Sequence, residues 1–129
     1  MTKQSKKVCT ELKQKIINWL ASNINVLIFD ENTIEIATSQ RDALGEEVYC
    51  FVEKKETALK VTDDGRCLFK LDPSASDEEL FESCANLIWD AGFEVNPSTG
   101  VIFTEVDSED LVPKISELAR LQVAISYLV

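Results

Sequence analysis

The stretch ALKVTDDGRCLFKL, from Ala58 to Leu71, decides how the middle of the chain folds. Leu59 and Val61 alternate with polar residues, which predicts a strand with one buried face. Asp63, Asp64 and Gly65 then interrupt the apolar pattern, as turn residues do. The direction of the chain after Gly65 determines whether another strand or a helix follows.

Two continuations of this stretch are open. A three-residue loop over Asp63, Asp64 and Gly65 would pair Val61 with Cys67 and Leu59 with Phe69, which places every apolar residue on one face. Because the hydrophobic pattern sets strand register, we favour this hairpin. The alternative is a short helix that begins at Asp64-Gly65 and buries Leu68 and Leu71 at i, i+3 spacing.

The segments before this stretch read as one helix and several strands. Apolar residues recur at helical spacing between Lys7 and Ser22 and predict a buried stripe behind a loose basic tail, residues 1–6: Val8, Leu12, Ile16, Trp19 and Leu20. Two strands flank residues 30–32, and a third follows over EVYCFVEKK. Its two apolar faces predict a position in the middle of the sheet.

The segments after this stretch predict a helix, a hairpin and a last helix. Ser76 and Glu79 form a capping box, and Gly92 suits the end of that helix. The hairpin covers residues 93–106, and the last helix is expected to follow Asp110, with Pro113 in its first turn. The 129 residues therefore predict a single α+β domain, in which N-terminal, middle and C-terminal helices accompany an antiparallel sheet in the order α-β-β-β-(β)-α-β-β-α.

The composition excludes several functional classes. The chain has no histidine, so a His-based nucleophilic triad, a His general base and His-ligated metals cannot be built. The four cysteines are widely spaced within apolar patterns, and we expect reduced core residues in a cytoplasmic protein. Neither a membrane-length apolar run nor a glycine-rich phosphate loop is present, and no cofactor or metal is predicted.

The charge is distributed unevenly. Residues 71–113 hold eleven acids and no Lys or Arg, whereas the N-terminal helix region is basic. This field disfavours nucleic acid and anionic lipid and favours a protein partner with a basic surface. Mimicry of nucleic acid and plain solubility remain alternatives. The candidate partner-binding residues are Asp77, Glu78, Glu79, Glu82, Asp90, Glu105, Asp107, Glu109 and Asp110.

Two metal-dependent sites are the competing hypotheses. Asp63 and Asp64 are adjacent carboxylates, but a hard cation needs more oxygen ligands, and a turn is the simpler interpretation. A strand that ends in Glu53-Lys54-Lys55, with Asp42 upstream, is similar to the core of metal-dependent nucleases. The aromatic residues Trp19, Phe81 and Trp89 are expected in the core.

The last helix is unusually apolar. LARLQVAISYLV has few polar breaks, so this helix is either deeply buried or partly covered by a second chain. We therefore name a candidate homodimer interface on this helix: Leu118, Leu121, Ile125 and Leu128.

From Glu11 to Leu128 the chain resembles an uncharacterised bacterial and phage family, the domain of unknown function 1828. The resemblance rests on the strand TIEIAT, the motif Val61-Thr62-Asp63-Asp64-Gly65, a helix that ends at AGFEV, and a last helix KISELARLQVAISYL. In that family an apolar helical pattern follows the VTDDG motif. The resemblance implies no activity or site residue, but it implies an accessory protein of a mobile element that acts on a host protein.

A looser resemblance, in element order alone, is to the dimeric chaperones of type III secretion, which bind an unfolded client segment. The leading hypothesis is thus a non-enzymatic acidic protein-interaction module. The alternatives are a metal-dependent nuclease-like enzyme and a client-binding dimer.

Overall fold

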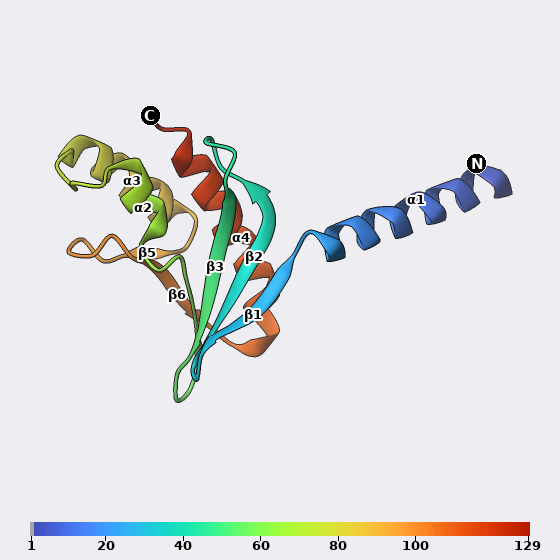
Figure 1. Ribbon diagram of the computed structural model, residues 1–129, viewed down its shortest axis with the longest axis horizontal. Coiled ribbons are helices and arrows are strands. Elements are labelled where there is room, and N and C mark those ends of the chain that lie inside the picture. Colours follow the sequence, from blue (N-terminus) through green and yellow to red (C-terminus); the bar gives the residue numbers. More distant parts are fainter. Residues whose placement is uncertain (1) are drawn as a thin grey trace.

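The computed structural model describes residues 2–129 of the chain (Figure 1). Its elements follow in this order: α1 (Lys3–Ser22), β1 (Asn25–Asp30), β2 (Thr33–Arg41), β3 (Glu47–Lys54), β4 (Leu59–Thr62), α2 (Arg66–Leu71), α3 (Glu78–Asp90), β5 (Glu94–Val95), β6 (Ile102–Val106), the 3-10 turn η1 (Ser108–Asp110) and α4 (Leu111–Ser126). The predicted α+β class is confirmed.

One antiparallel sheet of six strands organises the fold, in the order β1-β2-β3-β4-β6-β5. The sequence-adjacent strands β1 to β4 form a meander, and β6 then pairs with β4, with Val61 opposite Thr104. The prediction that β3 lies inside the sheet is confirmed, since β2 and β4 flank it.

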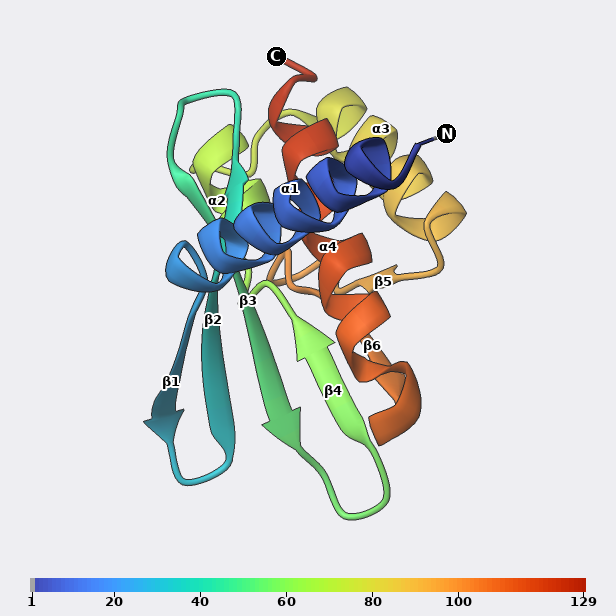
Figure 2. The same cartoon turned by 90° about the vertical axis from the view of Figure 1, so that its right-hand side faces the viewer.

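Helix α4 covers one face of the sheet and forms the core with it (Figure 2). Alternate strand residues such as Cys50, Val52 and Val61 point at this helix, and α3 packs beside α4 and against β5. The largest fully buried apolar side chains come from all of these elements: Phe51, Phe93, Ile88, Ile102, Leu118, Ile125 and Val61.

The chain leaves Gly65 as a helix, so the favoured hairpin is wrong and the alternative is confirmed. In α2, Cys67 is buried while Phe69 is exposed, which is helical rather than alternating burial. Asp64 and Gly65 both adopt positive φ, at 58° and 78°, and the chain reverses there. Strand β4 then finds its second partner in β6, about forty residues later, which no local pattern could indicate.

Helix α1 departs most from expectation. It begins at Lys3, with the Thr2 hydroxyl accepting the Ser5 N–H, so residues 3–6 are helical and not a loose tail; Met1 lies outside the described residues. None of its side chains is buried, and Figure 1 shows it projecting away from the sheet. The predicted stripe exists, but this chain does not cover it.

The ends of α3 and α4 follow local rules. Asp77, and not Ser76, caps α3, because its carboxylate accepts the Leu80 N–H at 3.0 Å. Asp110 precedes α4 as predicted, and Pro113 lies in its first turn. Among the described residues, no helix is both long and apolar enough to cross a membrane.

The predicted interface on α4 is wrong for three of its four residues. Leu118, Leu121 and Ile125 are buried against the sheet of their own chain, and only Leu128, beyond the helix, is exposed, at 41%. The apolar character of α4 is accounted for by the sheet. A second chain cannot reach these three side chains in the folded molecule.

Cysteine and tryptophan positions need similar corrections. Cys50, Cys67 and Cys84 are free and buried as expected, whereas Cys9 is exposed on α1. Trp19 and Trp89 are both exposed, at 58% each, so neither belongs to the core. Both tryptophans lie on helices whose apolar stripes predicted burial.

Candidate functional site

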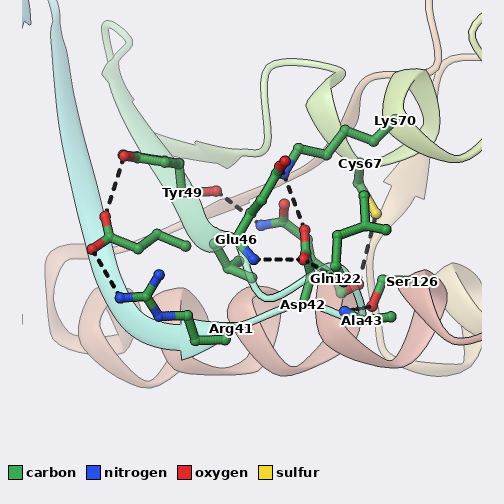
Figure 3. A network of polar contacts seen from close by, with 12 residues as sticks. Arg41, Asp42, Ala43, Glu46, Tyr49, Cys67, Lys70, Gln122 and Ser126 are labelled. Atoms are coloured by element: carbon green, nitrogen blue, oxygen red, sulfur yellow. Dashed lines mark hydrogen bonds and ion pairs between the residues drawn. The ribbon is translucent and has the colours of Figure 1, made fainter.

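A polar cavity of about 820 Å³ opens between the β2–β3 turn, α2 and α4 (Figure 3). Its lining combines acids and cations from the turn and from α2 with the polar side of α4. The polar residues that matter are Arg41, Asp42, Glu46, Glu47, Tyr49, Arg66, Lys70, Gln122 and Ser126.

Asp42 and Lys70 form the centre of this cavity. The Lys70 Nζ lies 3.0 Å from the Asp42 carboxylate and also pairs with Glu46, while the other Asp42 oxygen accepts the N–H groups of Leu44 and Glu46 at 2.9 and 3.0 Å. Burial by itself raises the pKa of Asp42, but Lys70 and the two N–H groups outweigh it and leave the pKa lowered. The pair thus ties α2 to the turn between β2 and β3.

The floor of the cavity is neutral. The Gln122 amide donates to the Tyr49 carbonyl at 2.9 Å, and the Cys67 thiol lies 3.9 Å from the Gln122 carbonyl. Burial, together with Asp63 nearby, raises the pKa of Cys50 to about 12 and also raises the pKa of Cys67. Both thiols therefore stay protonated at neutral pH, when they are poor nucleophiles.

The cations around the cavity are engaged by their own chain. Arg41 pairs with Glu47 at 3.6 Å, and Arg66 pairs with Glu35 at 3.6 Å while it covers the Tyr49 ring at 5.1 Å. A charged ligand would have to displace these partners. The arrangement holds the turn and α2 in place, and it offers no activated nucleophile.

Replacing Asp42 by asparagine is expected to lower the free energy of unfolding by about 1 kcal/mol at neutral pH, because Lys70 loses its buried partner. The folded pKa of Asp42 lies below its unfolded value of about 3.9, so its contribution is complete above that pH and is lost as the pH falls below it. Urea unfolding of both proteins at neutral and acidic pH measures this. The exposed Asp90→Asn serves as control; a difference that stays constant on acidification contradicts the prediction.

The nuclease-like residues are not brought together. Asp42 follows the last residue of β2, whereas Glu53 pairs opposite Thr33 at its start, so roughly 30 Å of strand separates them. Glu53 instead pairs with Lys55 and Lys60, at 3.3 and 3.9 Å. Within residues 2–129, no group of three or more Cys, Asp or Glu is placed to hold a metal ion.

Asp63 and Asp64 also separate. Asp64 is exposed, whereas Asp63 is fully buried and accepts three backbone N–H groups: Gly65 at 2.8 Å, Ile102 at 2.9 Å and Cys67 at 3.1 Å. Burial raises the pKa of Asp63, against the opposing effect of these three donors. Asp63 therefore joins β4, β6 and α2 and does not share an ion with its neighbour.

The nine candidate partner-binding acids are all exposed, but they do not form one surface. Five of them lie along α3, where Asp77 also caps the helix. The other four lie on β6 and around η1, near the start of α4 (Figure 2). Three of this second group border a smaller hollow of about 440 Å³ together with Lys114: Glu105, Asp107 and Asp110.

Sequence reasoning missed the largest exposed apolar feature, which we call the α1–β1 surface. It joins the stripe of α1 to both faces of β1 and the adjacent part of β2, and its members are Val8, Leu12, Ile16, Ile17, Trp19, Leu20, Ile24, Val26, Leu27, Ile28, Phe29 and Ile34. Ile28 is 85% exposed. A usable signal was present: NVLIF is apolar on both faces, which fits a strand covered on both sides.

Neither protein-family models, nor curated proteins, nor solved structures match this chain. The resemblance to the domain of unknown function 1828 stays a prediction, and the arguments below rest on the residues and their geometry.

Proposed function

We propose that this chain is an acidic protein-interaction module that binds protein through the α1–β1 surface. The carrying observation is that twelve large apolar residues of one continuous segment pair are exposed to solvent. Monomeric proteins rarely expose a contiguous apolar patch larger than a few hundred Å², and larger patches commonly mark binding sites.

The helix itself supports this proposal. Most of the stability of a helix in a protein comes from packing of its apolar face, and α1 has no buried residue in the chain alone. A partner on the stripe would supply that packing. The exposed acids on α3 and around η1 remain free beside it and favour a partner with a basic surface, for which a protein of a bacterial host is the candidate that the family resemblance suggests.

Selective labelling of Cys9 tests the proposal. Cys9 is exposed on α1 while the other three thiols are buried, so a photo-reactive maleimide attaches beside the stripe. We expect illumination in a cell lysate to give discrete protein adducts, either with the chain itself or with another protein. The double variant Leu12→Glu, Ile16→Glu should abolish them. Labelled protein that forms no adduct more often than that variant does would refute the proposal.

The client-binding alternative uses the same surface differently. Strand β1 offers a free edge to which an extended segment could add as a further strand. Adducts with many different unfolded clients, in place of one discrete species, would favour this alternative.

A further inference from the structure

We infer that the partner on the α1–β1 surface is a second copy of this chain, and that the two copies exchange their α1 helices. This inference rests on the proposed function and names the occupant of the same surface. In the exchanged dimer, α1 of each copy covers an apolar strip of the other copy. We call this strip, formed by Val26, Ile28 and Ile34, the acceptor strip.

The acceptor strip is the uncovered continuation of the core. Val26 lies opposite Ile36, which lies opposite the buried Cys50, and Ile28 lies opposite Ile34. Opposed residues share a sheet face, so this strip is on the face that α4 covers. Helix α4 packs on β2, β3 and β4, and the edge of this face beside β1 is left for another helix.

The chain holds the two halves of a complementary pair. Helix α1 carries five lysines and one glutamate, a net charge of +4; since the whole chain carries −10, the remaining residues carry −14. A basic amphipathic helix on an acidic body that lacks one covering helix is favourable in both charge and polarity. Two copies satisfy both pairings at once.

The connection to β1 directs α1 outward. Only Asn23 and Ile24 separate the two elements, and Asn23 closes the helix by donating its backbone N–H to the carbonyls of Trp19 and Leu20. Figure 2 shows α1 standing in front of the face that carries α4. Such short connections favour exchange of an element between copies.

The free edge of β1 supports the same arrangement. This strand is the end of the sheet, and its sequence NVLIFD has neither Lys nor Pro to discourage pairing. Antiparallel pairing of β1 with its own copy would join two sheets of six strands and bring Leu27 and Phe29 of each copy together on the other face. Exposed edges of this kind are what monomeric proteins avoid.

The area is adequate for a stable dimer. A twenty-residue helix is about 30 Å long and about 10 Å wide. With the acceptor strip and the β1 edge, each copy would cover on the order of 800 Å², which is the contribution of one partner to a standard interface.

The oligomeric state of matched variants tests the exchange. We expect light scattering to give the wild type twice the 14.5 kDa of one chain at micromolar concentration. The helix variant Leu12→Glu, Ile16→Glu and the acceptor variant Val26→Glu, Ile34→Glu should each be monomeric. The control Val112→Glu alters an equally exposed residue on α4 and should stay dimeric. Urea unfolding confirms that each variant is folded.

Mixing the two monomeric variants distinguishes exchange from other dimers. The acceptor variant retains an intact α1 and the helix variant retains an intact acceptor strip, so a mixture should form a heterodimer through one complete pairing. A dimer built from α1 against α1 would leave the acceptor variant dimeric by itself and would overturn the exchange. A mixture that remains monomeric would overturn it as well.

The inference and the proposed function fail in different ways. A wild type that is monomeric at micromolar concentration but forms a discrete Cys9 adduct with another protein refutes the second copy and leaves the interaction module standing. A monomer without any adduct refutes both.

Discussion

Replacing Asp63 by alanine is expected to lower the free energy of unfolding by about 4 kcal/mol. The substitution removes the acceptor of three backbone N–H groups, those of Gly65, Cys67 and Ile102, at a fully buried position. A buried donor left without a partner costs about 1–3 kcal/mol. Urea unfolding followed by circular dichroism measures the change.

The neighbouring Asp64 provides the matched control. It is exposed with φ of 58°, a conformation that asparagine tolerates, so Asp64→Asn should change the free energy by no more than about 0.5 kcal/mol. Asp63→Asn should fall between the two, because its amide keeps one acceptor oxygen and turns a second donor toward the backbone N–H groups. Equal stability of the Asp63→Ala and Asp64→Asn proteins would contradict the buried cap.

Replacing Leu118 by alanine is expected to cost about 3 kcal/mol of unfolding free energy without changing the mass of the native protein. Leu118 is fully buried between α4 and the sheet, where truncation loses transfer free energy and leaves a cavity. Urea unfolding gives the stability, and light scattering gives the oligomeric state.

The companion substitution is Leu128→Ala, in the exposed residues after α4. It should cost no more than about 0.5 kcal/mol. If Leu118→Ala instead dissociates a dimer and leaves the stability of the chain unchanged, α4 would be an interface after all, and the placement of its apolar side in the core would be wrong.

Much of the fold could be predicted because its elements follow local patterns. The alternation in β2, β3 and β4 indicated strands, and Gly92 and Pro113 marked the end of α3 and the start of α4, as the structure confirms. The helix after Gly65 was the less favoured alternative. In six residues, Cys67 and Phe69 fit a strand as well as Leu68 and Leu71 fit a helix, so periodicity could not separate them.

The candidate site could be predicted only in part. Asp42 was singled out for a metal, but its partner is Lys70, twenty-eight residues further along the chain, and the two meet because α2 folds against the β2–β3 turn. Similarly, Asp63 was read as a turn residue. Its burial depends on the N–H of Ile102, thirty-nine residues away, and on the pairing of β4 with β6.

The sequence by itself determined the α+β class, the acidic exposed residues from Asp77 to Asp110 and the apolar stripe of α1. These are local properties of composition and spacing, and they hold wherever the segments are placed. Only the tertiary structure decided what covers each apolar face. Helix α4 spends its apolar side on its own sheet, whereas α1 and β1 have no cover within the described residues. Periodicity shows that a face is to be covered; which element covers it depends on contacts between segments distant in the chain or in another copy of it.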